Sequence, residues 1–127
     1  MNHKKYFILM ILCLFTCLSQ NGWTQDDMEF VDNSVFTNPT RPAAIFKHDL
    51  HNDKAGINDC AICHHVYDES GQLLPDESSE DKSCSDCHAM ESIGNQPGLM
   101  KAFHLNCKGC HETQNQGPLM CGECHKR

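Results

Sequence analysis

Apolar residues are unevenly distributed along this chain of 127 residues. One apolar run, interrupted by Thr16 alone, extends from Phe7 to Leu18, and after it the apolar positions form short, separated groups. The steadiest pattern spans Leu99 to Lys108, which predicts a helix, and helix-like character continues to His111. The segment from Tyr67 to Ser83 contains glycine, proline, serine and many acidic residues, so it predicts a loop or a small hairpin.

The segment after residue 25 begins as a polar lead-in with isolated apolar residues, from Asp26 to Asn38. Pro39 and Pro42 then mark a turn, and Ala43 to Phe46 can pair with the lead-in as a short strand. We therefore expect a single domain over residues 26–127. Its predicted fold is mainly irregular, with short α-helices and a small N-terminal β-hairpin.

The first 25 residues have the features of a secretory signal peptide. Lys4 and Lys5 precede the 12-residue apolar run, which is too short to cross a bilayer and suits a signal h-region. Residues 19–25 contain no clear cleavage motif, so we expect cleavage anywhere within them. An uncleaved anchor and a lipid attached to Cys17 are the alternatives, although the residues before Cys17 fit a lipid-attachment motif poorly. Export would place the mature chain where disulfides can form.

The composition of residues 26–127 excludes several classes of protein. These 102 residues contain 17 Leu, Ile, Val and Phe, and they carry 17 acidic against 8 basic residues, a net charge of −9. Few large apolar residues with a high net charge are typical of a disordered chain, not of an enzyme with an ordinary core. The acidic balance also argues against a nucleic acid as partner. Because the same stretch holds eight cysteines and eight histidines, we expect a bound group to organise the fold.

All eight of these cysteines belong to four copies of one motif, C-x-x-C-H. The copies are Cys60–His64, Cys84–His88, Cys107–His111 and Cys121–His125. This motif is the attachment signature of c-type haem: two thiols bond one edge of the porphyrin, and the next histidine reaches the iron. Zinc sites and disulfides also use C-x-x-C pairs, but neither requires a histidine directly after the pair. Four haems c are therefore the predicted cofactors.

Four histidines outside the leader and the motifs match the demand for a second ligand to each iron. They are His48, His51, His65 and His104. His48 and His51 are three residues apart, so a helical turn places them on one face, where they can serve two haems. His65 directly follows His64, and because neighbouring side chains diverge, His65 should reach a different haem. The alternative second ligands are methionines, which would raise the reduction potential: Met28, Met90, Met100 and Met120.

The order of these motifs resembles the class III multihaem cytochromes, the tetrahaem cytochrome c3 family, from about Ala44 to the C-terminus. The sequence of H-x-x-H, C-x-x-C-H-H, C-x-x-C-H, H-x-x-C-x-x-C-H and C-x-x-C-H carries this resemblance. Many family members have a longer C-x-x-x-x-C-H at the second and fourth sites, whereas this chain has the short form at all four. Together with the acidic loop from Val66 to Ser83, that form is similar to the acidic branch associated with membrane complexes.

The resemblance implies a complete set of haem-binding residues. The thioether cysteines would be Cys60, Cys63, Cys84, Cys87, Cys107, Cys110, Cys121 and Cys124. The proximal and distal ligands would pair as His64 with His48, His88 with His65, His111 with His51, and His125 with His104. The division of His48 and His51 between the first and third haems comes from the resemblance alone.

The implied function is low-potential electron transfer in the periplasm during anaerobic respiration, not enzyme catalysis. Iron with two histidine ligands has no open position for a substrate, and two imidazoles favour a low potential. The implied partners are redox proteins, such as a hydrogenase or another periplasmic donor and a membrane redox complex, and we expect no membrane span within the domain. The alternative is a multihaem reductase with one open haem, acting on sulfur, nitrogen or metal species.

Overall fold

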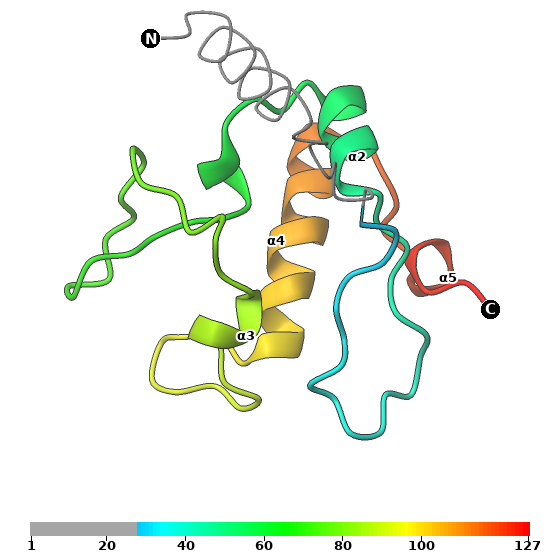
Figure 1. Cartoon of the computed structure of the whole chain (residues 1–127), viewed down its shortest axis with the longest axis horizontal. Coiled ribbons are helices and arrows are strands. Elements are labelled where there is room, and N and C mark those ends of the chain that lie inside the picture. The colour runs from blue at the N-terminus through cyan, green and yellow to red at the C-terminus, as the bar shows by residue number, and fades with distance from the viewer. Residues whose placement is uncertain (1–27) are drawn as a thin grey trace, which may run out of the picture.

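The computed structural model describes residues 28–127, which form short helical elements joined by irregular segments (Figure 1). In chain order the elements are α2 His48–Ala55, a 3-10 helix Cys60–Ile62, α3 Cys84–Cys87, α4 Leu99–Gln114 and α5 Cys121–Cys124. Extended pairing within these residues is limited to isolated antiparallel bridges. The predicted fold class, mainly irregular with short helices, is confirmed. The predicted signal peptide and its cleavage range lie outside the described residues.

Helix α4 is the longest element, and the other elements lie around it (Figure 1). Its first residue is tied to the α3 region, because the Leu99 N–H donates to the Ala89 carbonyl at 2.7 Å. The helix ends at Gln114, where Asn115 adopts a left-handed conformation with φ 52°. The prediction of a helix ending at Lys108 was therefore too short. Gly109 does not break the helix, and the polar residues after His111 are compatible with its exposed surface.

The N-terminal pairing predicted from the sequence is present as a single bridge instead of a ladder. Phe30 and Ile45 form this antiparallel bridge. The Val31 N–H donates to the Ala44 carbonyl at 2.9 Å, and the Phe46 N–H donates to the Glu29 carbonyl at 2.8 Å. A second small hairpin occurs in the acidic loop, where Tyr67 pairs with Leu73. The loop prediction for residues 67–83 is thus confirmed.

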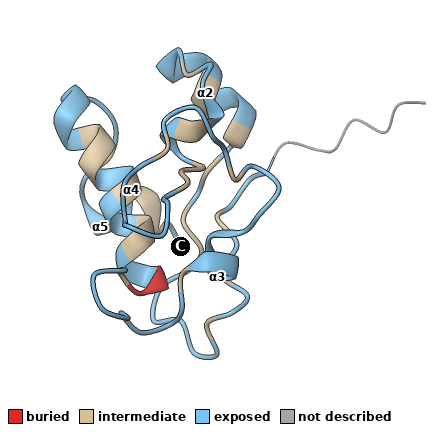
Figure 2. Ribbon diagram, turned by 90° about the vertical axis from the view of Figure 1, so that its left-hand side faces the viewer, coloured by how far each residue is buried: buried red, intermediate tan, exposed pale blue. Residues whose placement is uncertain are grey.

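The described chain buries very little of its own apolar surface. Leu99, at 1% exposure, is the one buried residue within 28–127, whereas fourteen large apolar side chains in this range are at least 40% exposed. Figure 2 shows this contrast, with buried colour confined to the start of α4. An ordinary domain of this size would have a contiguous apolar core. Among the described helices, none combines the length and the apolar character of a membrane span.

Candidate haem-binding site

Three of the four C-x-x-C-H motifs form isolated helical turns. In each, the histidine N–H donates to the carbonyl of the first cysteine, at 2.8 Å for His64 and His88 and 2.9 Å for His125. Residues three apart lie on one face of such a turn, so the two thiols of each motif point to the same side. The third motif, Cys107–His111, lies inside α4. All four motifs therefore share a local geometry in which two thiols and one imidazole follow each other along a helical turn.

Each isolated turn is capped by one carboxylate. Asp59 precedes its turn and accepts from the Ala61 N–H inside it at 2.9 Å, where the helix itself offers no partner. Asp86 and Glu123 lie in their turns and reach back to the preceding backbone: Asp86 accepts from the Ser83 N–H at 2.7 Å, and Glu123 accepts from the N–H groups of Met120 at 2.7 Å and Leu119 at 3.0 Å. Both kinds of cap stabilise turns that are too short to form alone.

None of the eight motif cysteines forms a disulfide in the described chain. Desolvation by the surrounding chain raises the pKa of Cys107 to about 11, with Cys63 as the next contributor. Desolvation also raises the pKa of Cys63 and of Cys84. Before any group is attached, burial therefore favours the protonated thiol over the thiolate at these three cysteines. Within residues 28–127, no group of three or more His, Cys, Asp or Glu side chains is arranged to hold a metal ion.

The structure brings each motif histidine close to one of the four remaining histidines. The distances between ring centroids are 6.4 Å for His48 and His64, 6.0 Å for His65 and His88, 6.1 Å for His51 and His111, and 6.3 Å for His104 and His125. A metal held between two imidazoles, with metal–nitrogen bonds of about 2 Å each, requires a centroid separation of about 6 Å. The spacing of all four pairs fits an iron ion between the rings.

These four pairs are the same pairs that the family resemblance implies. His48 and His51 both lie on α2 and reach different motif histidines, and the adjacent His64 and His65 also reach different partners. The alternative methionine ligands are all exposed, from 48% for Met28 to 70% for Met120. The role of each histidine as a ligand stays a prediction.

Three motif histidines are oriented by prolyl carbonyls. Each donates its Nδ1–H to one carbonyl: His88 to that of Pro97 at 2.9 Å, His111 to that of Pro118 at 2.8 Å, and His125 to that of Pro42 at 2.7 Å. Because a carbonyl can accept but not donate, Nδ1 carries a proton in each ring, and in the neutral imidazole the lone pair is then on Nε2. Metal-binding histidines in proteins are usually held by such a contact. This arrangement fits a haem iron on Nε2.

The surroundings of His65 favour its neutral form. Burial lowers the pKa of His65, and the nearby imidazoles of His88 and His64 lower it further. A neutral imidazole is the metal-binding form, so protons compete less for this ring than for an isolated histidine.

Gly117 also shapes the site, although it was not among the residues predicted from the sequence. Its φ is +86°, and a Cβ atom there would lie 2.6 Å from Cδ2 of His111. Only a glycine lets the backbone pass this close to the ring while Pro118 accepts its Nδ1–H. The Gly-Pro dipeptide six residues after a motif histidine was a signal available in the sequence, whereas the Pro42 contact, 83 residues from His125, was not.

Comparison with known proteins identifies the class of this site. The model of the class III cytochrome c family matches residues 25–125. The chain therefore belongs to the class III cytochrome c family, and it is a multihaem c-type cytochrome whose family binds haem c covalently.

Individual relatives differ in how much of their length this chain covers. It is 33% identical over 94 residues to a cytochrome c3 of Desulfovibrio desulfuricans, covering 69% of this chain and 82% of that protein. It is 37% identical over 71 residues to the high-molecular-weight cytochrome c of Nitratidesulfovibrio vulgaris, covering 52% of this chain. The chain spans only 13% of the length of that larger protein. Among solved structures, a cytochrome c7 of Geobacter sulfurreducens, PpcB, is 28% identical with a TM-score of 0.40, covering 81% of this chain and all of that one.

Proposed function

We propose that this chain is a tetrahaem, low-potential electron-transfer protein in which every iron has two histidine ligands. The observation that carries the proposal is the set of four histidine pairs, because each combines one motif histidine with one histidine from elsewhere. Covalently bound haem c supplies a one-electron couple. Protein side chains then fill both axial positions, which favours electron transfer over binding of a substrate.

The proposal assigns a role to each residue of the site. The thioether residues are Cys60, Cys63, Cys84, Cys87, Cys107, Cys110, Cys121 and Cys124. The proximal ligands are His64, His88, His111 and His125, and the distal ligands in the same order are His48, His65, His51 and His104. The adjacency of His64 and His65 requires two of the haems to lie close together, so neighbouring irons should interact. The measured reduction potentials should then describe the coupled haems together and not each haem separately.

The exposed apolar side chains support four haems as the core of the domain. Fourteen large apolar residues within 28–127 are exposed, and a porphyrin is a large apolar surface that can cover them. The free energy of burying apolar surface is about 25 cal/mol per Å², so covering these side chains is a substantial contribution to folding. The haems would then replace the protein core that the composition lacks.

Haem stoichiometry and carbon monoxide binding test the function together. The mass of the purified protein should show four haems per chain, its spectrum should be low-spin, and the reduced protein should bind no carbon monoxide. A His104→Ala variant is the positive control, because opening one axial position should allow about one carbon monoxide per chain. Three haems would contradict the tetrahaem assignment, and wild-type protein that binds one carbon monoxide would favour the multihaem reductase.

The proposal includes a periplasmic location and redox protein partners in anaerobic respiration. The apolar run near the N-terminus supports export, and the similarity to cytochrome c3 supports a carrier between redox proteins. A hydrogenase or another periplasmic donor and a membrane redox complex are the proposed partners. Mediator-free reduction of the purified protein by a hydrogenase under hydrogen tests the donor, and a requirement for an added mediator would contradict it.

A further inference from the structure

We propose that Asp49 lowers the reduction potential of the haem held by His48 and His64, by making His48 a more electron-donating ligand. This inference rests on the proposed function, in which His48 is the distal ligand of that haem. Asp49 would thus be a positioning residue that acts on the iron through His48.

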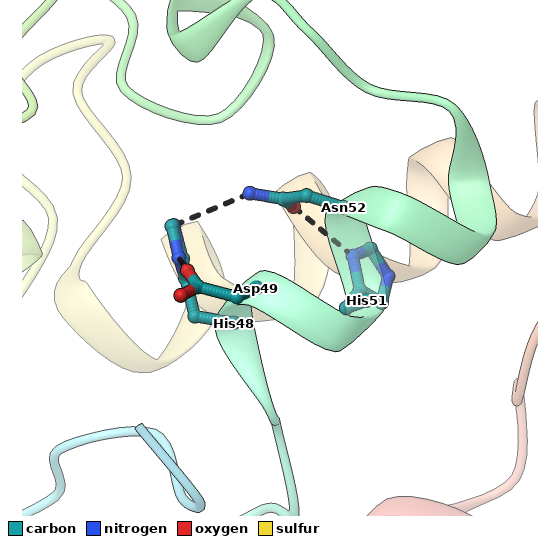
Figure 3. A network of polar contacts seen from close by, with 4 residues as sticks. All are labelled: His48, Asp49, His51 and Asn52. Atoms are coloured by element: carbon teal, nitrogen blue, oxygen red, sulfur yellow. Dashed lines mark hydrogen bonds and ion pairs between the residues drawn. The ribbon is translucent and has the colours of Figure 1, made fainter. Parts of the chain in front are cut away.

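The side chains around His48 define which nitrogen of its ring carries the proton. Its Nδ1 lies 2.8 Å from Oδ1 of Asp49, and its Nε2 lies 3.4 Å from the amide nitrogen of Asn52 (Figure 3). A carboxylate accepts and an amide nitrogen donates, so both neighbours favour a proton on Nδ1 and a lone pair on Nε2. The 3.4 Å contact is long for a hydrogen bond, so its loss would cost little if Nε2 bound a metal.

The acceptor at His48 differs in charge from the acceptors at the motif histidines. His88, His111 and His125 donate to neutral prolyl carbonyls, whereas His48 donates to a carboxylate. A charged acceptor draws the Nδ1 proton more strongly and leaves more electron density on the ring. An electron-rich ligand stabilises oxidised iron relative to reduced iron, so the potential of that haem falls.

The position of Asp49 sets the size of the effect. Asp49 lies in the first turn of α2, where the helix dipole favours a negative charge. Its side chain is 78% exposed, so water screens much of its charge. We therefore expect a few-fold change in the reduction equilibrium of one haem, at most about tenfold, which is about 59 mV for a one-electron couple.

Two substitutions on α2 separate the contact from a general effect of charge. Asp49→Asn keeps an oxygen that can accept from His48 but removes the charge at that oxygen. Asp53→Asn removes the same charge one helical turn away and is the matched control. Each variant is compared with wild type by haem count, by stepwise potentiometry followed by NMR of the individual haems, and by the EPR signals of the low-spin irons.

The expected result is a higher potential for one haem in Asp49→Asn, a smaller shift in Asp53→Asn, and a changed EPR signal in Asp49→Asn alone. Equal shifts of potential in the two variants, or no shift in Asp49→Asn, would overturn the inference about Asp49. If the wild type still has four low-spin haems, the proposed function is unaffected by that result. A wild-type protein without low-spin haem would instead refute the proposed function itself.

Discussion

The third and fourth attachment motifs are only ten residues apart, yet they are held in different ways. The third lies inside the 16-residue helix α4, so hydrogen bonds of the helix continue on both sides of it. The fourth forms α5, which has only four residues and depends on contacts from outside. The N–H of Ile45 donates to the Cys124 carbonyl at 2.9 Å, and the Pro42 carbonyl accepts from His125.

The difference separates local from long-range control of a ligand. His111 is oriented by Gly117 and Pro118, which follow it closely in the chain, whereas His125 is oriented by a segment near the start of the domain. Local contacts can form before the rest of the chain folds. Long-range contacts close a large loop, and the entropy lost in closing it must be compensated by other favourable interactions. The site of the third motif should therefore be more autonomous than the site of the fourth.

The largest effect is expected when the haems are not attached. This experiment tests whether α4 can form in the haem-free chain. With Leu99 as the one buried residue of the described chain, the haem-free protein should be unfolded. Most helical stability in proteins comes from tertiary packing, and Leu99 is the one buried residue of α4, so the far-ultraviolet dichroism should show weak helicity and no cooperative melt. The haem-loaded protein is the control. A native-like spectrum with a cooperative melt in the haem-free chain would contradict both this prediction and the role of haem as the core.

A second large effect should follow from Gly117→Ala, which breaks the local control of His111. The added Cβ would lie 2.6 Å from the His111 ring, and the backbone φ of +86° is unfavourable for alanine. We expect displacement of this ligand, seen as loss of one low-spin haem signal or of one haem by mass.

Gly71→Ala is the matched control for that substitution. Gly71 has a similar φ of +81°, but nothing lies within 4 Å of its Cβ position. It should cost about 1–2 kcal/mol of stability for the left-handed conformation alone, with all haem signals unchanged. If the two variants have the same spectrum, contact with the His111 ring is not what requires a glycine at position 117.

Local patterns in the sequence were sufficient to predict the attachment turns and the chemistry of the candidate site. The C-x-x-C-H spacing predicts one helical turn, and such a turn is present at all four motifs. The histidines that approach these motifs could be predicted by counting, whereas their complete pairing was implied by the resemblance to the cytochrome c3 family. The start of α4 was predictable at Leu99 because apolar periodicity begins there.

Contacts that depend on the tertiary arrangement were not predictable. Pro42 reaches His125 across 83 residues, and no local pattern indicates which carbonyl will meet a given ring. The end of α4 at Gln114 was missed because apolar periodicity fades where the helix surface is exposed, while the backbone hydrogen bonds continue to Asn115. Asp49 was missed because an exposed acidic residue is ordinarily part of a solvated surface, and its contact with His48 becomes apparent only from the geometry.

The smallest expected effect concerns the Glu123 cap of α5. It tests whether this four-residue helix depends on a side-chain cap for its stability, unlike the longer α4. Hydrogen bonds from the backbone N–H groups of Met120 and then Leu119 lower the pKa of Glu123. A carboxyl group with a lowered pKa in the folded state stabilises that state above its unfolded pKa, and this contribution is lost as the pH falls through the folded pKa. Glu123→Gln should therefore lower the Tm by a few degrees at neutral pH. The Tm difference between this variant and the wild type should shrink as the pH falls below the ordinary pKa of glutamate.

The control for this variant is Glu112→Gln, which removes the same charge from the last turns of α4. A carboxylate near the C-terminus of a helix is unfavourable, because the helix dipole is negative there. Its removal should leave the Tm unchanged or raise it slightly, without the acid-dependent convergence expected for Glu123→Gln. Thermal melts of the haem-loaded proteins across the acidic range measure both effects. If Glu123→Gln follows the wild-type Tm at every pH, α5 does not depend on its cap. The contrast between the locally held third motif and the externally held fourth motif must then rest on the Pro42 and Ile45 contacts alone.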